Sequence, residues 1–76
     1  MSKHELNARN LLCPLPVIRA QNKIASLDAG DHLVVYCTDP GTLHDIPAWC
    51  RVHGHTLVSA EENSDEIIIE IEVVKD

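Results

Sequence analysis

The chain has 76 residues, 45% of them hydrophobic, and a net charge of −6, which fits one folded domain (residues 1–76) better than a disordered chain. No apolar run approaches the roughly 20 residues that cross a bilayer, and the first ten residues lack the apolar core of a signal peptide, so we expect a cytoplasmic protein. Only Tyr36 and Trp49 offer large aromatic rings, which argues against strong direct binding of nucleic acid.

The first half of the chain predicts a strand, a helix and a second strand. Residues 4–9 alternate weakly and form a short strand with Leu6 and Ala8 on one face. Residues 14–28 place apolar side chains at helical spacing, and Gly30 supplies the stop for this helix. The stripe consists of Val17, Ala20, Ile24 and Leu27. Residues 32–37 form a β-branched apolar run of strand length.

The second half predicts a turn, a helix and a hairpin. We expect a turn at residues 39–42 and a helix that becomes regular near Asp45, which would cap it, with Pro47 in its first turn and Gly54 after its end. A start at Thr42 is the alternative, and it would put Pro47 deeper in the helix. Residues 55–62 and 66–74 flank a turn at 63–65 as two strands. In the last strand Ile67, Ile69, Ile71 and Val73 face the core, whereas Glu70 and Glu72 face water.

The predicted order is therefore β-α-β-α-β-β. Two helices would cover one face of a four-stranded mixed sheet, and the other face would stay partly exposed. This is a two-layer α/β sandwich of the α+β class.

Charge is distributed unevenly along the chain. Residues 1–27 carry four basic residues against Glu5, a balance of +3, and the last sixteen residues carry seven acids against Lys75, a balance of −6. Such asymmetry favours docking to protein partners.

Three cysteines are present, Cys13, Cys37 and Cys50. An odd number in a chain without an export signal predicts free thiols rather than a disulfide framework. Cys37 ends a strand and Cys50 lies on an apolar helix face, so both are interpreted as core residues. Cys50, His53 and His55 resemble metal ligands only faintly, because a zinc site needs four placed donors and no second pair is evident. No metal is therefore predicted.

Cys13 is different because it precedes two prolines in the run CPLP. If Pro14 is the first helical residue, Cys13 is the N-cap, and the helix dipole would stabilise its thiolate and lower its pKa. Arg9 and Arg19 would add to the positive field. Burial as a small hydrophobe is the alternative, although cysteine is not a favoured N-cap. Asp39 and Asp45 are most simply turn and cap residues.

Two blocks of the chain resemble the TusA (SirA-like) family of small sulfur-carrier proteins. Residues 6–24 contain the Cys-Pro-x-Pro motif of that family, and residues 29–55 resemble its second block. That block runs from Thr-Asp-Pro-Gly through Asp-Ile-Pro-x-aromatic-Cys to Gly-His. Asn7 and Asn10 stand where relatives often have Asp and Gly, and Leu12 stands where many carry Arg or Lys. Asn10 can replace the glycine if its φ is positive.

The resemblance implies that Cys13 carries a persulfide and that no cofactor is needed. By similarity, Cys13 accepts sulfane sulfur from a cysteine desulfurase or a rhodanese and passes it to a DsrE/TusD-like acceptor protein. The pathway could be tRNA thiolation, molybdenum-cofactor synthesis or sulfur oxidation.

Two other functions remain open at the level of the sequence. One is a non-enzymatic thiol-based regulatory or protein-binding module, in which Cys13 senses redox state or docks a partner. The other is a thiol oxidoreductase, which ranks last because a Cys-x-x-Cys motif is missing. A monomer is expected from the small size.

Overall fold

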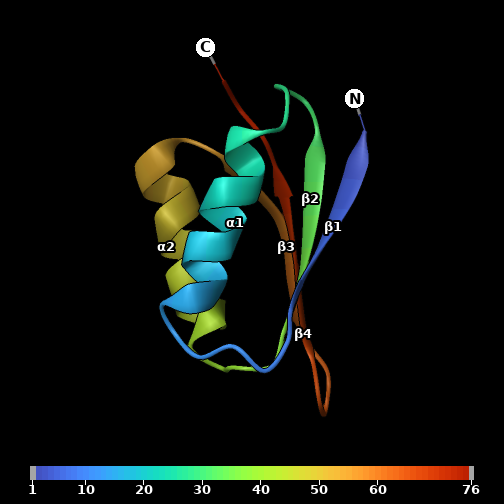
Figure 1. Ribbon diagram of the computed structural model, residues 1–76, viewed down its shortest axis with the longest axis vertical. Helices are drawn as coiled ribbons and strands as arrows, with labels where there is room; N and C mark the ends of the chain where they lie inside the picture. The colour runs from blue at the N-terminus through green and yellow to red at the C-terminus, as the bar shows by residue number, and fades with distance from the viewer. Residues whose placement is uncertain (1, 76) are drawn as a thin grey trace.

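Six elements follow one another along residues 2–75, the part of the chain that this computed structural model describes (Figure 1). They are β1 (Lys3–Ala8), α1 (Leu15–Ala25), β2 (His32–Cys37), α2 (Thr42–His53), β3 (Thr56–Glu62) and β4 (Ile67–Glu72). The predicted order β-α-β-α-β-β is confirmed. Neither helix is long and apolar enough to cross a membrane.

The strands form one mixed sheet in the order β1-β2-β4-β3. β1 and β2 are parallel, and the pairs β2–β4 and β3–β4 are antiparallel. A parallel pair needs a crossover, which α1 supplies, whereas β3 and β4 are joined by a short hairpin turn. Both helices lie on the same face of the sheet, as Figure 1 shows, so the predicted two-layer sandwich is confirmed.

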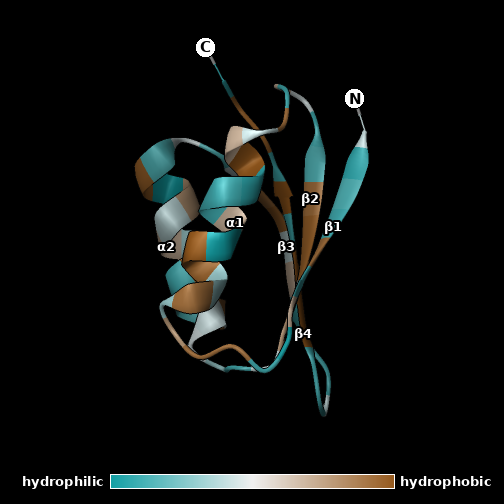
Figure 2. Cartoon of the chain, in the orientation of Figure 1, coloured by the Kyte–Doolittle hydropathy of each residue, from teal (hydrophilic) through white to brown (hydrophobic). Residues whose placement is uncertain are grey.

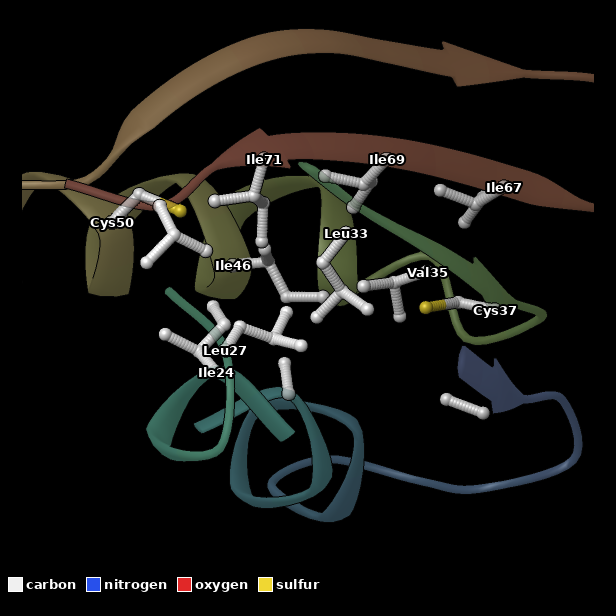
Figure 3. Packing of buried hydrophobic residues seen from close by; sticks show 13 residues of the cluster. Ile24, Leu27, Leu33, Val35, Cys37, Ile46, Cys50, Ile67, Ile69 and Ile71 are labelled. Carbon is white, nitrogen blue, oxygen red and sulfur yellow. The ribbon is translucent and has the colours of Figure 1, made fainter. Parts of the chain in front are cut away.

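The hydrophobic core lies between this sheet face and the helices. In β4 the buried residues Ile67, Ile69 and Ile71 alternate with partly exposed ones, as their period of two predicts. Figure 3 shows side chains of β2 and β4 pointing toward α1 and α2, where Ile24 and Ile46 meet them. In Figure 2 the middle of β2 is hydrophobic, whereas the first half of β1 is hydrophilic.

Polar pairs occupy the opposite face of the sheet. The Tyr36 hydroxyl donates to a Glu5 carboxylate oxygen at 2.8 Å, and His32 Nδ1 lies 2.7 Å from Glu70. These contacts join neighbouring strands through side chains that point away from the helices.

α1 begins and ends at different residues from those predicted. Its first residue is Leu15, with Pro14 as the N-cap, and its last residue is Ala25. Gly30 does not stop the helix; it has a φ of 90° in the turn that leads into β2. The chain leaves the helix earlier because Ser26 Oγ and the Ser26 N–H both bond to the Lys23 carbonyl, which closes the last turn.

α2 begins at Thr42, so the preferred start near Asp45 was wrong and the alternative start is correct. The turn at Asp39 sets this start, because the Thr42 N–H and hydroxyl both donate to the Asp39 carbonyl, at 3.0 and 2.7 Å. Pro47 is accommodated as the sixth helical residue. Gly54 ends the helix with a φ of 78°, as predicted.

Candidate functional site

Two loops meet at one end of the sheet. Because β1 and β2 are parallel, the loops that follow them leave the same edge, and Figure 1 shows them running side by side below the helices. The Asn10 N–H donates to Thr38 Oγ1 at 2.8 Å and links the two loops. Asn10 has a φ of 64°, which meets the condition under which asparagine can replace a glycine.

Cys13 is exposed on the first of these loops. Its backbone N–H donates to Asp39 Oδ2 at 2.9 Å, and Asp39 Oδ1 accepts the Gly41 N–H at 3.0 Å. These two hydrogen bonds lower the pKa of Asp39 and keep it anionic. A single carboxylate therefore holds the cysteine backbone against the start of α2.

The predicted N-cap role of Cys13 was wrong. Pro14 is the N-cap of α1, and its carbonyl accepts the Ile18 N–H at 3.1 Å, so Cys13 lies one residue outside the helix. The Leu15 N–H bonds to the Leu12 carbonyl at 2.9 Å, which makes a turn around the cysteine. The Cys13–Pro14 peptide bond is cis.

The Cys13 thiol faces a carboxylate instead of a positive field. Cys13 Sγ donates to Asp45 Oδ2 at 2.6 Å. This hydrogen bond, together with burial and the negative charges of Asp45 and Asp39, raises the pKa of Cys13 to about 12. The predicted lowering of the pKa was therefore wrong, because the thiol meets the acid in the first turn of α2 rather than the N–H groups of α1.

Arg9 is engaged on the polar face of the sheet. Its guanidinium bonds to the Glu66 carboxylate and lies 4.6 Å above the Tyr36 ring, and the Glu66 hydrogen bond raises the pKa of Arg9. Arg19 is exposed on α1. The charges that act on the Cys13 sulfur come from Asp45 and Asp39.

The other two cysteines lie in the core, as predicted. Cys37 is 0% and Cys50 1% exposed. Burial raises the pKa of both thiols, that of Cys50 to about 11. Among residues 2–75 the structure brings together no group of three or more His, Cys, Asp or Glu that could hold a metal.

The two histidines near Cys50 have structural contacts of their own. His55 Nδ1 accepts the Val74 N–H at 3.1 Å. The Trp49 ring lies 4.8 Å from the His53 ring and 5.2 Å from the His55 ring, and its Nε1–H donates to Gln21 of α1. These contacts connect α2 to α1 and to the residue that precedes β3.

Three features of the site escaped the sequence analysis. The first is the contact between Cys13 and Asp45, which are 32 residues apart. The second is the exposure of Leu12 on the cysteine loop and of Leu15 and Ile18 in the first part of α1, at 73%, 44% and 45%. The third is Gly41, where an added Cβ would lie 3.3 Å from Cys13 Sγ. Of these three features, only the apolar side chains could have been recognised in the sequence, because Leu12, Leu15 and Ile18 follow one another at intervals of three residues.

Fold and site together define a class: a small two-layer α/β protein that presents one exposed thiol, beside an apolar surface, where two loops of parallel strands meet. Residues 4–73 match the family model described as Sulfurtransferase TusA. The chain therefore belongs to the TusA family.

Known proteins of similar sequence and structure agree with this assignment. Two proteins of Neisseria meningitidis, from a serogroup A and a serogroup B strain, are named as candidate sulfur carrier proteins. Each is 42% identical over 62 residues, which is 82% of this chain and 84% of theirs. The crystal structure of a SirA-like protein from Desulfitobacterium hafniense superposes with a TM-score of 0.81. It is 23% identical and covers 95% of this chain and 99% of its own, so it supports the fold.

Proposed function

We propose that this protein is a sulfur carrier whose Cys13 accepts sulfane sulfur as a persulfide and passes it to an acceptor protein. The observation that carries this proposal is the accessibility of the three cysteines. Cys13 alone is exposed, whereas Cys37 and Cys50 are enclosed in the core. In a family of sulfurtransferases, the exposed thiol is the one that a donor can reach.

The transfer needs only thiols and persulfides. Cys13–SH reacts with a donor R–S–SH to give Cys13–S–SH and R–SH. The Cys13 sulfur forms a bond to the outer sulfur of the donor, the S–S bond of the donor breaks, and its inner sulfur leaves and takes up the thiol proton. The reverse exchange with an acceptor thiol unloads the carrier. No external oxidant or reductant is consumed, and neither step requires a cofactor.

The proposed partners are proteins. A cysteine desulfurase or a rhodanese would load Cys13, and a DsrE/TusD-like protein would unload it. The exposed Leu12, Leu15 and Ile18 lie on the cysteine loop and the first part of α1 and provide apolar surface for such contacts. We further propose that the protein works as a monomer in the cytoplasm, where reducing conditions keep all three cysteines as thiols. Thiolation of tRNA, molybdenum-cofactor synthesis and sulfur oxidation are the pathways that such a carrier can serve.

Intact mass spectrometry tests the carrier role. The reduced protein is incubated with a persulfide-loaded cysteine desulfurase or rhodanese, beside the Cys13→Ser variant. We expect the wild-type protein to gain the mass of about one sulfur atom, the gain to be reversed by a thiol reductant, and the variant to gain nothing. An unchanged wild-type mass with donors that load other carriers would contradict the proposal and favour a binding or regulatory module.

A further inference from the structure

The Cys13 sulfur is held from several sides in the free protein. Its backbone is fixed by the hydrogen bond from the Cys13 N–H to Asp39 Oδ2, at 2.9 Å. Its thiol donates to Asp45 Oδ2 at 2.6 Å. Because the side chain has a single torsion between Cα and the sulfur, fixing the backbone and bonding the sulfur together select one rotamer. An exposed cysteine without these contacts would sample all three.

Gly41 leaves room for the Cys13 sulfur on the side of α2. Its φ of −59° and ψ of −24° are helical values that any residue adopts, so its backbone conformation does not demand glycine. An added Cβ would, however, lie 3.3 Å from Cys13 Sγ and 3.5 Å from Asp39 Oδ1. Glycine at this position leaves the space that the sulfur occupies when it bonds to Asp45.

The charged groups around the sulfur have the same sign. Asp39 reaches it from the loop after β2 and Asp45 from the first turn of α2, and these two carboxylates act on Cys13. Both lie near the N-terminus of α2, whose dipole favours negative charge there. The site therefore accommodates two carboxylates and a neutral thiol better than it would accommodate a third negative charge.

We propose that Asp45 controls the proton of Cys13: it holds the sulfur as a thiol in the free carrier, with Asp39 fixing the Cys13 backbone and Gly41 leaving room for the sulfur, and it must be neutralised or displaced before the sulfur reacts. This inference rests on the proposed function and assigns Asp45 a part in it. A lysine, arginine or histidine side chain that a partner places against Asp45 would remove the negative charge that opposes the thiolate. Sulfur exchange would then be confined to the docked complex.

Alkylation with iodoacetamide, followed as a function of pH, tests this role on the unloaded protein. The reagent is neutral, so removing a carboxylate does not change its attraction to the site. We compare the wild-type protein with Asp45→Asn and with Asp28→Asn, which removes the same charge in the turn after α1. Peptide mapping identifies the modified cysteine, and Cys13→Ser supplies the background.

We expect Asp45→Asn to shift the rate–pH curve of Cys13 to lower pH and to raise its rate at pH 8 about tenfold. The gain in thiolate is partly offset because a less basic thiolate is a weaker nucleophile. Asp28→Asn should follow the wild-type curve. Coincident curves for Asp45→Asn and the wild type would overturn the proposal.

Gly41→Ala tests the same mechanism with both carboxylates in place. The methyl group should push the sulfur by a few tenths of an ångström, weaken its hydrogen bond to Asp45 and shift the curve in the same direction by a smaller amount, while urea unfolding reports whether the fold is intact. A folded Gly41→Ala protein with the wild-type curve would overturn the inference that the sulfur needs the space at Gly41 to reach Asp45, whereas a shifted curve would support the Asp45 contact even if Asp45→Asn failed to fold. None of these readouts uses sulfur loading, so a failure of the carrier function would be seen separately in the mass experiment.

Discussion

The loop that carries Cys13 and the core that holds Cys50 suppress the thiolate by different physical means. The pKa is raised in both, to about 12 for Cys13 and about 11 for Cys50. In the core the cause is burial, which disfavours any charge, whereas at the exposed loop the first cause is one hydrogen bond to Asp45. A thiol that burial keeps protonated can ionise only when the fold opens. A thiol that one nearby carboxylate keeps protonated can ionise once that carboxylate is neutralised.

The largest expected effect is the difference in alkylation rate between Cys13 on the loop and Cys50 in the core. In the Asp45→Asn protein at pH 8, Cys13 should react with iodoacetamide about a thousandfold faster than Cys50, because the core thiol reacts only through opening that costs several kcal/mol. Quantitative peptide mapping over time measures both rates. In concentrated urea the two rates should converge, and similar rates in the folded protein would show that Cys50 is not protected by the core.

The packing that protects Cys50 can be weakened directly. Ile69→Ala removes a fully buried side chain from the middle of β4 and should lower the free energy of unfolding by about 3 kcal/mol. Val58→Ala on the exposed surface of β3 is the matched control and should change it by less than about 0.5 kcal/mol. Urea unfolding followed by the fluorescence of Trp49 measures both. A similar cost for the two variants would contradict the location of the core.

The raised pKa of Cys50 predicts a dependence of stability on pH. The folded protein keeps this proton up to about pH 11, whereas the unfolded chain releases it near pH 8.5, so the unfolded state binds fewer protons between these values. Stability should therefore fall as the pH rises above about 8.5. Comparison with Cys50→Ala isolates the contribution, because Cys13 and Cys37 titrate in both proteins.

From pH 7 to pH 10 the stability of the wild type relative to Cys50→Ala should drop by about 1–2 kcal/mol. Urea midpoints at several pH values measure this difference. If the difference stays constant over that range, burial does not hold the Cys50 proton.

The smallest expected effect concerns the loop itself. Asn10 has a φ of 64°, and its N–H bonds to Thr38 Oγ1. Asn10→Ala should cost about 1 kcal/mol because alanine tolerates this conformation poorly, whereas Asn10→Gly should cost little. Urea unfolding measures both variants. Equal costs would indicate that the asparagine side chain, rather than the backbone conformation, matters at this position.

Periodic and local features were predictable from the sequence. The alternation in β4, the apolar run of β2 and the stop at Gly54 are set by neighbouring residues, and the structure confirms each of them. For Asn10 the family resemblance set only a condition, that asparagine can replace glycine if its φ is positive, and the structure meets that condition.

The helix starts and the environment of Cys13 were not predictable in the same way. α2 begins at Thr42 because of the turn that Asp39 makes, and Pro47 is accommodated despite its depth in the helix. The contact between Cys13 and Asp45 depends on how two loops meet after the sheet has formed. The neighbouring residues in the sequence indicate that Cys13 lies next to the start of α1. In the folded chain, the Asp45 carboxylate lies against its sulfur.

The short side chain of Cys13 limits how a persulfide sulfur could be passed between proteins. Its sulfur is one side-chain torsion away from a backbone that Asp39 holds, and a persulfide would extend it by one bond of about 2 Å. In such a carrier the sulfur is not attached through a long flexible group. Its reach is too short to span two partners at once, so donor and acceptor must bring their own sulfur atoms to the same face in succession. The protein would have to leave one partner before it served the next.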